Sequence, residues 1–457
     1  MPIPRLLTLV AVVTATSCQT YSPEPVDVAE HARLFAARVP DGGSIGAFVA
    51  RLRDRDAPTA GVDLGDGIEL REARYVALLL NPDLRTSRLR AGVAQVSTEN
   101  AGLWADPELS GDLVRILETV AHPWLVGGAL GITLPITGRL GLEQDLADTC
   151  LAQALTEARL AEARVLDALD AHWVRLGAGR ARVELLTDLL ERLAALEAVA
   201  ARLTEAQLIT QLAARTFTLE RVARGLELLR AQATVAATEI EVKQLMGLHP
   251  TASVQLLPVT SVTPRLADPA LRRVQILDGP RVTRGQREHA VTERQLALAI
   301  RKQWPELTLL PGFQEEDAQP RAALGFSLPL PLWNANAREI AEARAQREVA
   351  AQALRGDVER AIQDLARAEV GVQAAAAQRV LVDSELVPLA EQQVADGRRL
   401  VELGQLDTLL VLDSLLRGHQ AKVAAIDVAL TEAEATIELN SLFWPTLTLG
   451  DDREAPR

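Results

Sequence analysis

Three short segments of this chain occur twice, in the same order and about two hundred residues apart. The pairs are Trp104-Ala-Asp-Pro-Glu-Leu109 with Trp304-Pro-Glu-Leu307, Gly131-Ile-Thr-Leu-Pro-Ile136 with Gly325-Phe-Ser-Leu-Pro-Leu330, and Ala206-Gln-Leu208 with Gly404-Gln-Leu406. Solenoid repeats are only about 20 to 50 residues long, so this spacing indicates one large unit that was duplicated and fused. We expect each copy to contain a helix, two short strands, a very long helix, a tight turn and a returning helix.

The two copies have predictable boundaries. We place the first repeat at 68–249, a linker rich in Pro, Thr, Ser and Val at 250–266, the second repeat at 267–445, and a tail at 446–457. Proline and glycine recur at 107–136 and at 305–331 and exclude a continuous helix there. Each of these two segments is therefore predicted to form a pair of strands, with Val126 to Ile136, Leu307 to Leu310 and Ala322 to Leu330 among them.

Long helices should make up most of each copy. No proline occurs from about Arg139 to Leu203, and leucines recur there at helical spacing. Roughly 65 residues at about 1.5 Å each predict a rod on the order of 100 Å long. Asn81-Pro82-Asp83 should break or kink the first helix of copy one, and Pro388 should bend the long helix of copy two, because proline lacks the backbone N–H.

The composition agrees with long packed helices. Hydrophobic residues make up 48% of the chain but aromatic residues only 3%, so the apolar content is mainly Ala, Leu and Val. The net charge is −13 and no run rich in Lys and Arg occurs. An acidic chain of this kind is a poor nucleic-acid binder, and we predict no nucleic-acid partner.

The first 17 residues have the form of a secretion signal peptide. One arginine precedes the apolar run Leu6 to Val13, and small residues follow directly before Cys18. The segment resembles the lipobox of bacterial lipoproteins, although Ala15 stands where leucine is usual. The resemblance implies that Cys18 is lipidated and begins an extended leader at 18–67, and Gln19 favours sorting to the outer membrane. The alternative is an ordinary signal peptide with an incidental cysteine.

Catalytic and metal-binding patterns are missing from the sequence. The six histidines are scattered, with none three or four residues from another, and no phosphate-binding loop or nucleophile motif occurs. No stretch of 18 or more apolar residues follows the signal, so we predict no transmembrane helix. We therefore predict no enzyme activity, no metal site and no cofactor, and we interpret Cys150 as a small core residue.

Several motifs resemble one family, the TolC-type outer-membrane efflux proteins, over about 68 to 445. Gly325 to Asn334, which runs directly into a helix rich in Ala, Glu and Arg, resembles the fourth strand and following helix of that family. Asn81-Pro-Asp-Leu84 and Gly102 to Leu109 resemble its first-helix and first-strand entries. The segment Gly404 to Asp413 resembles its second helical hairpin tip, and a lipidated Cys18 fits its lipoprotein branch.

The resemblance implies a fold that is mainly α with a small β part, assembled as a homotrimer. Duplicated long helical hairpins form a hollow α-barrel across the periplasm. The two strand pairs of each chain contribute to a shared trimeric 12-stranded β-barrel in the outer membrane. An open strand edge in lipid is costly, so two strand pairs alone cannot close a barrel. The implied partners are a periplasmic adaptor (membrane fusion protein) and an inner-membrane pump of the RND or ABC type.

The resemblance also implies roles for individual residues. Asp413 matches one aspartate that closes the periplasmic aperture of relatives, and Asp407 would add a second ring, but Leu410 replaces the other aspartate. The adaptor-facing tips are Ala206, Gln207, Gly404 and Gln405. The membrane-interface aromatics are Trp104, Trp124, Trp304 and Trp333. The alternatives are a solvated surface aspartate for the gate and ordinary loop packing for the tryptophans.

Charged residues within or between the strand segments are unfavourable on a face that contacts lipid. We therefore expect these residues to lie in loops or to face the lumen: Arg115, Glu118, Glu315, Glu316 and Asp317.

The function implied is a passive, lipid-anchored outer-membrane exit duct of a tripartite efflux or secretion system. Pro329-Leu-Pro-Leu-Trp-Asn334 resembles the metal-cation branch, but nothing else in the sequence names a substrate. The alternative is a pore-less periplasmic coiled-coil structural lipoprotein. An adaptor subunit fits less well, because adaptors carry one hairpin flanked by β-rich domains and this chain carries two hairpins.

Overall fold

The computed structural model describes residues 21–52, 64–118, 123–316, 319–402 and 408–445. The chain divides into two units, Met1–Val39 and Pro40–Arg457. In the first unit, helix α2 (Val28–Ala36) begins after Asp27, whose Oδ1 accepts a hydrogen bond from the backbone N–H of Glu30 at 2.9 Å. Every residue of α2 keeps appreciable exposure to solvent.

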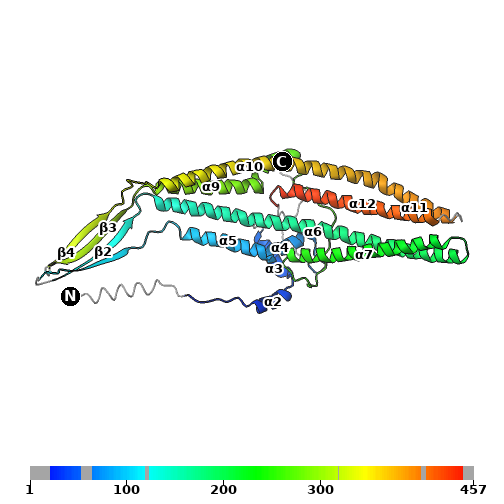
Figure 1. The fold of residues 1–457 in the computed structure, drawn as a ribbon, viewed down its shortest axis with the longest axis horizontal. Coiled ribbons are helices and arrows are strands. Elements are labelled where there is room, and N and C mark those ends of the chain that lie inside the picture. Colours follow the sequence, from blue (N-terminus) through cyan, green and yellow to red (C-terminus); the bar gives the residue numbers. More distant parts are fainter. Residues whose placement is uncertain (1–20, 53–63, 119–122, 317–318, 403–407, 446–457) are drawn as a thin grey trace. The chain divides into compact units, whose positions relative to one another are not determined.

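The second unit carries the duplicated pattern of helices and a strand pair (Figure 1). Its first half contains α3 (Gly42–Leu52), α4 (Leu70–Leu80), α5 (Pro82–Glu99), β1 (Glu108–Arg115), β2 (Trp124–Leu134), α6 (Arg139–Glu205) and α7 (Gln211–Leu245). Its second half contains α8 (Pro269–Gln275), a 3₁₀ turn η1 (Ile276–Asp278), α9 (Pro280–Arg301), β3 (Leu307–Glu316), β4 (Gln319–Ser327), α10 (Ala337–Leu381), a π-helical turn η2 (Val382–Leu386), α11 (Val387–Glu402) and α12 (Thr408–Ser441). The prediction of a mainly helical chain with a small β part is confirmed.

Helix α6 is the centre of the helical part. It has 67 residues, about 100 Å at 1.5 Å per residue, and packs against α7 on one side and α12 on another. Leu186, Leu189 and Leu193 are buried at the helical spacing that the sequence indicated. Because α10 packs against α12 in turn, the long helices lie side by side in the order α7, α6, α12, α10.

The predicted helix break at Asn81 is confirmed, and the side chain of Asn81 caps the start of the next helix. Helix α4 ends at Leu80, and Oδ1 of Asn81 accepts hydrogen bonds from the backbone N–H groups of Asp83 and Leu84, which start α5. Nδ2 of Asn81 donates to the carbonyl oxygen of Leu245 at 2.8 Å. Next to it Gly247 has φ +70°, and a Cβ there would lie 2.3 Å from the oxygen of Leu80. The end of α7 is therefore fixed against the break between α4 and α5.

The segment between the two halves lies on α6. Leu256 forms a parallel bridge with Ile68, and both belong to a core that includes Trp173 of α6. A Cβ on Gly177 would lie 2.7 Å from the carbonyl oxygen of Val259, so glycine permits this close approach. The connecting segment is thus packed on α6.

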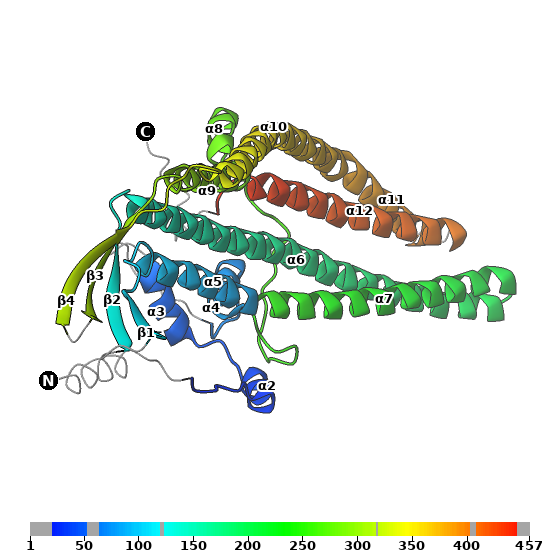
Figure 2. The ribbon, with the colours of Figure 1, turned by 60° about the vertical axis from the view of Figure 1, so that its left-hand side comes forward.

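Pro388 perturbs the long helix of the second half, as predicted. The five residues before α11 form a π-helical turn, η2, and such bulges are a common cause of kinks. Figure 2 shows α10 and α11 as one bent helix on the outside of α12.

The strands form one antiparallel sheet in the order β1-β2-β3-β4. Strand β3 is longer than predicted, because it continues past Pro311 to Glu316. Residues on both sides of Pro311 pair with β2, and Pro311 itself pairs with Leu324 of β4, so one missing N–H does not end the strand. Within the described residues, the outer edges of β1 and β4 have no strand partner in this chain.

Among the described residues, no helix combines the length and the apolar character needed to cross a membrane.

Candidate functional site

The two faces of the sheet differ in chemistry. Cross-strand partners lie on the same face, and residues alternate between faces along a strand, so the register assigns every strand residue. One face, called here the apolar face, carries Leu109 and Leu113 of β1, Trp124, Val126, Leu130, Ile132 and Leu134 of β2, Leu307, Leu309, Pro311 and Phe313 of β3, and Ala322, Leu324 and Phe326 of β4. Leu109, Leu324 and Phe326 are each more than 70% exposed. Nearer the helices, Ile132, Leu134, Leu307 and Leu309 are partly buried.

The opposite face is mostly polar or small, but it also carries Val114, Leu125 and Leu310. It carries Ser110 and Asp112 of β1, Gly127, Ala129, Gly131 and Thr133 of β2, Thr308, Gly312 and Gln314 of β3, and Arg321, Ala323, Gly325 and Ser327 of β4. The hydroxyl groups of Thr133 and Thr308 lie 3.0 Å apart across two strands. The sheet therefore has one apolar face and one face that is mainly polar or small.

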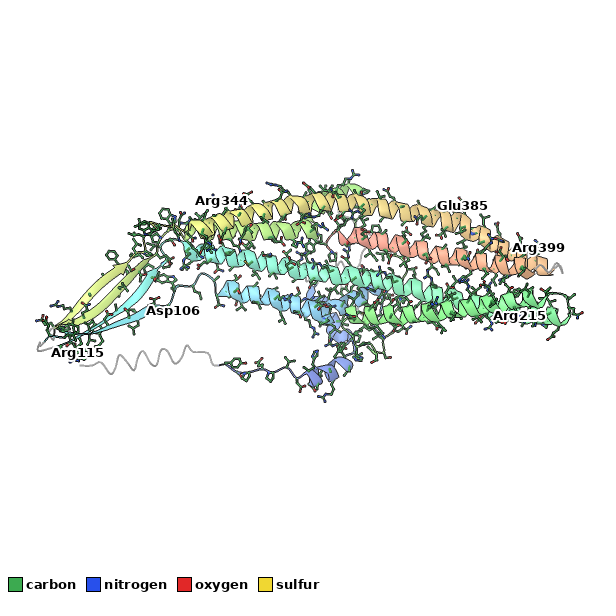
Figure 3. The ribbon with its side chains drawn as sticks, viewed as in Figure 1. Asp106, Arg115, Arg215, Arg344, Glu385 and Arg399 are labelled. Atoms are coloured by element: carbon green, nitrogen blue, oxygen red, sulfur yellow. The ribbon has the colours of Figure 1, made fainter. Side chains whose placement is uncertain are left out.

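For two of the charged residues, the predicted location in a loop or on the lumen side is wrong. Arg115 and Glu315 lie neither in loops nor on the polar face: they are strand residues, and the register places them on the apolar face. Both lie at its hairpin end, where Arg115 pairs with Trp124 and holds its guanidinium carbon 5.5 Å from that ring (Figure 3). At this edge a charged group can reach water. Glu118 lies after β1 as expected, and Asp317 lies outside the described residues.

The four tryptophans flank the sheet at both ends. Trp124 begins β2 at the hairpin end. Trp104 precedes β1, Trp304 precedes β3 and Trp333 lies between β4 and α10, at the end nearer the helices. All four are at least half exposed, and Trp333 is 95% exposed.

The predicted tip of the first hairpin is the turn between α6 and α7. Ala206 caps α6, and Gln207 has φ +57° in the left-handed region. The backbone N–H of Leu208 donates to the carbonyl oxygen of Leu203 at 2.9 Å, which completes the helix end. Leu208 is 70% exposed and Leu212 78%. The turn and the start of α7 therefore present apolar side chains to solvent.

Asp413 lies near the start of α12. Its neighbour Leu412 is buried against Leu189 and Leu193 of α6, whereas the Asp413 carboxylate is half exposed and accepts a hydrogen bond from Nε of Arg417 at 2.7 Å. An arginine one turn away therefore offsets part of the charge that the sequence analysis assigned to a gate. Cys18, Gly404, Gln405 and Asp407, the other residues assigned roles, lie outside the described residues, as do the predicted signal peptide at 1–17 and tail at 446–457.

The sequence analysis missed an apolar stripe on α7. Its residues face away from α6 and are exposed: Leu212, Leu219, Val222, Leu226, Leu229 and Ile240. They are spaced by alternating steps of three and four residues or by multiples of seven, like the a and d positions of a coiled coil. Arg215 interrupts this spacing near the tip (Figure 3). The opposite side of α7, with Phe217, packs on α6. Heptad counting along 211–245 would have revealed the second seam.

A second exposed apolar surface lies at the other end of the row of helices. It is formed by residues of α10, η2 and α11: Val349, Ile362, Val370, Val380, Leu381, Leu386 and Leu389. Helices α7 and α10 are the two outer members of the row. One chain therefore has an apolar surface at each side and nothing in its own described part to cover either.

Among the described residues, no group of three or more His, Cys, Asp or Glu side chains is placed to hold a metal ion. Cys150 is partly buried in α6 and has no disulfide partner in the described chain. Burial raises the pKa of its thiol, which disfavours a reactive thiolate.

Comparisons with known proteins identify the fold. No family model matches the sequence, and no curated protein matches it either. Solved structures do match. The outer-membrane channel OprN superimposes with a TM-score of 0.71 and 16% identity, over 83% of this chain and 91% of OprN.

Two further structures agree over more of the chain. CusC, described as undergoing transmembrane channel formation, gives a TM-score of 0.69 at 13% identity over 86% of this chain and 99% of CusC. The CmeC outer-membrane channel of Campylobacter jejuni gives 0.69 at 12% identity over 93% of this chain and 94% of CmeC. The chain therefore has the fold of the outer-membrane channel proteins, as its duplicated pattern predicted.

Proposed function

We propose that this protein is the outer-membrane exit duct of a tripartite efflux or secretion system. The observation that carries the proposal is the sheet, which has one exposed apolar face and one face that is mainly polar or small, and whose two outer edges have no strand partner among the described residues. In a bilayer the apolar face meets lipid and the polar face meets water. Unpaired edges cost several kcal/mol per backbone group in lipid, so strands of further copies must cover them.

The dimensions of the apolar face suit a membrane. Strand β2 runs from Trp124 to Leu134, which is roughly 33 Å at about 3.3 Å per residue. A strand tilted by about 40° then spans roughly 25 Å, the height of the apolar band of outer-membrane proteins. The tryptophans at the two ends would lie at the two interfaces, and Arg115 and Glu315 would lie at the outer one.

Three copies would close both the sheet and the row of helices into rings. Twelve strands would form a shared barrel. In the helical part, the α7 stripe of one copy would pack on the α10–α11 surface of the next, a head-to-tail contact that closes into a ring. The contact buries both apolar surfaces that a single chain leaves exposed.

The proposed duct works passively between partners. The hairpin tips, with exposed Leu208 and Leu212, would contact a periplasmic adaptor, which joins the duct to an inner-membrane RND- or ABC-type pump. A lipid on Cys18 would anchor the leader in the outer membrane, and Asp413 would contribute a negative ring at the aperture. The likeness to channels such as OprN and CusC supports this proposal through the fold.

Single-channel recording tests the proposal. We expect the purified full-length protein to form discrete, trimer-sized conductances in planar bilayers, with a preference for cations that Asp413→Ala weakens. Glu359→Ala is the matched control, because Glu359 is an exposed carboxylate of α10 far from the tip. A protein that stays monomeric and never inserts would instead support the pore-less periplasmic spacer.

A further inference from the structure

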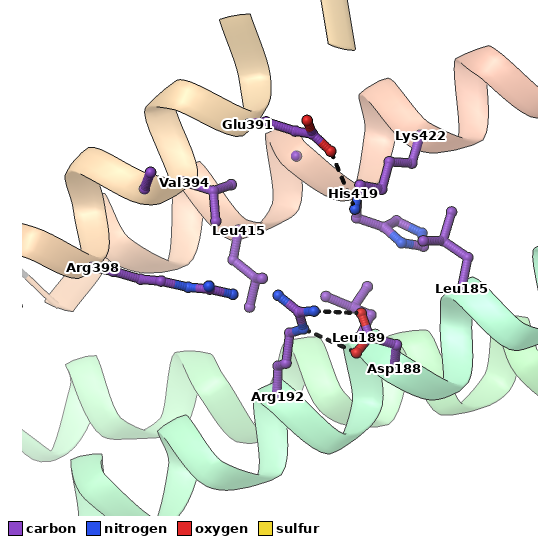
Figure 4. Close-up of a pocket in the computed structure, with 12 residues that line it drawn as sticks. Leu185, Asp188, Leu189, Arg192, Glu391, Val394, Arg398, Leu415, His419 and Lys422 are labelled. Carbon is purple, nitrogen blue, oxygen red and sulfur yellow. Dashed lines mark hydrogen bonds and ion pairs between the residues drawn. The ribbon is translucent and has the colours of Figure 1, made fainter. Parts of the chain in front are cut away.

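A pocket with an unusual histidine lies where α6, α11 and α12 meet (Figure 4). Its volume is about 270 Å³. The apolar side chains are Leu185 and Leu189 of α6, Val394 of α11 and Leu415 of α12. His419 of α12 lies among them, with its imidazole directed toward Leu185 in the gap between α12 and α6.

His419 is buried without a hydrogen bond. It is only 7% exposed, and neither ring nitrogen has a partner in the structure. A neutral imidazole carries one donor and one acceptor, and a protonated one carries two donors and a charge. An unpaired buried polar group is costly, and a buried unpaired charge far more so. The site therefore tolerates only the neutral ring.

The charged groups around His419 do not offer it a free counter-ion. On α6, Asp188 pairs with Arg192 at 3.0 Å. Lys422 of α12 pairs with Glu391 of α11 at 3.5 Å. The remaining charged neighbours are Arg182 of α6 paired with Asp427 of α12, Arg224 paired with Glu227 on α7, and the exposed Arg398 of α11.

Burial is the main reason that the pKa of His419 lies below its ordinary value of 6.5. Arg224 and Arg182 lower this pKa further, while Glu227 and Asp188 raise it. The packed state therefore binds a proton less readily than a state in which α12 has left α6.

We propose that the His419 pocket is a proton-sensitive junction, in which protonation of the imidazole releases the start of α12, and α11 with it, from α6. The contacts of α12 define which end moves. Toward its C-terminal end, α12 is tied to α6 by ion pairs of Arg182 with Asp427 and of Arg175 with Glu434. Toward its N-terminal end, the contact with α6 is apolar, through Leu412 and Leu415. His419 lies between the two regions, so the charged ring frees the tip end and leaves the far end attached.

The effect of this movement on the channel rests on the proposed function. In a trimeric duct, outward movement of the α11–α12 tip in each copy widens the aperture. Acidification is then a stimulus for opening that acts without a partner protein.

The pH window follows from the direction of the shift. If only the released state takes up the proton, with a pKa near 6.5, lowering the pH from 7 to 5 favours release by roughly 25-fold per chain. The effect begins as the pH falls through about 6.5 and is absent above about 7.5.

The test measures the movement itself. Spin labels at the exposed positions Glu191 of α6 and Leu410, at the tip end of α12, report their separation by pulsed electron paramagnetic resonance, in the full-length protein reconstituted in lipid nanodiscs. We expect a longer distance component that appears below pH 6.5 and reverses on neutralisation. His419→Gln and His419→Phe, one polar and one apolar, are both expected to abolish it. His289→Gln is the control, because His289 lies on α9 beside Glu293 and does not line the His419 pocket.

Two results would overturn the inference. One is a distance distribution that does not change between pH 7.5 and pH 5. The other is a change that persists in both His419 variants, which would assign it to other groups. Conductance recorded in parallel separates this question from the proposed function: a pH-dependent distance without conductance keeps the junction and removes the duct, and conductance without a pH-dependent distance does the reverse.

Discussion

An arginine on the apolar face of the sheet should prevent insertion, whereas an arginine on the neighbouring residue should not. Leu324 of β4 lies on the apolar face and pairs with Pro311. Ala323 is adjacent in sequence, lies on the polar face and pairs with Gly312. Leu324→Arg and Ala323→Arg therefore add the same charge to the same strand on opposite faces.

The expected cost follows from the depth of Leu324. Its row of the sheet lies near the middle of the apolar face, midway between the hairpin end and the helix end. A lipid-facing arginine at the bilayer midplane costs about 2–4 kcal/mol, which is roughly a 30- to 700-fold change in an equilibrium constant. Three chains that insert together would carry about three times that cost. The arginine at position 323 keeps its guanidinium in water and should cost almost nothing.

Folding into lipid vesicles from urea measures the difference. The fluorescence of the tryptophans that flank the sheet reports insertion as the urea concentration is lowered. We expect Ala323→Arg to insert at the same urea concentration as the wild type, and Leu324→Arg to require much less urea or to remain outside the vesicles. Helical content by circular dichroism shows whether the periplasmic part still folds.

Equal behaviour of the two variants would refute the assignment of the faces. If both insert normally, the apolar face does not contact lipid. If both fail, the strand does not tolerate a long side chain on either face, and the alternation of the two faces does not describe the membrane contact.

Three further outcomes are expected. Arg265→Ala leaves the Asp167 carboxylate, which Arg265 contacts at 2.8 Å, without its partner and should destabilise the helical part by about 3–5 kcal/mol. Burial already raises the pKa of Asp167 and Arg265 lowers it, so the deficit seen in thermal unfolding should be larger at pH 7 than at pH 4, where Asp167 gains a proton. Leu226→Asp should abolish the trimer seen by mass photometry, whereas Thr234→Asp, an exposed position of α7 outside the stripe, should leave it intact; trimers in both variants would exclude the stripe as an interface. Gly247→Ala should lower the Tm by several degrees, because its Cβ would lie 2.3 Å from the last carbonyl oxygen of α4; an unchanged Tm would show that this junction adjusts at little cost.

Local sequence signals predicted the elements well. Proline and glycine marked the two strand segments, helical leucine spacing marked α6, and Asn81-Pro82 marked the break that the structure shows. Each of these signals acts through residues a few positions apart, by removing an N–H, permitting a positive φ or capping a helix. For the same reason the duplicated order of elements was visible before any contact was known.

The length of β3 and the face on which two charged strand residues lie could not be predicted from such local signals. From the sequence, the third strand is predicted only over Leu307 to Leu310, and the charges of Arg115 and Glu315 are expected in loops or on the lumen side. Only the register between strands shows that β3 continues and that these two residues lie at one edge of an apolar face. The pairing of β2 with β3, such as Gly128 with Phe313, joins segments almost two hundred residues apart, and no local pattern contains it.

The sequence by itself determined the helices, the strand segments and the duplicated plan, because these follow from backbone constraints and short-range periodicity. Tertiary packing decided which surfaces remain uncovered and which polar groups are buried. The same heptad spacing gives α7 a seam against α6 and a second seam with no partner in the chain. His419 is one of six histidines in the sequence, and only the meeting of α6, α11 and α12 removes it from water. Burial is a property of distant segments brought together, so its consequences for charge and function appear only in the folded chain.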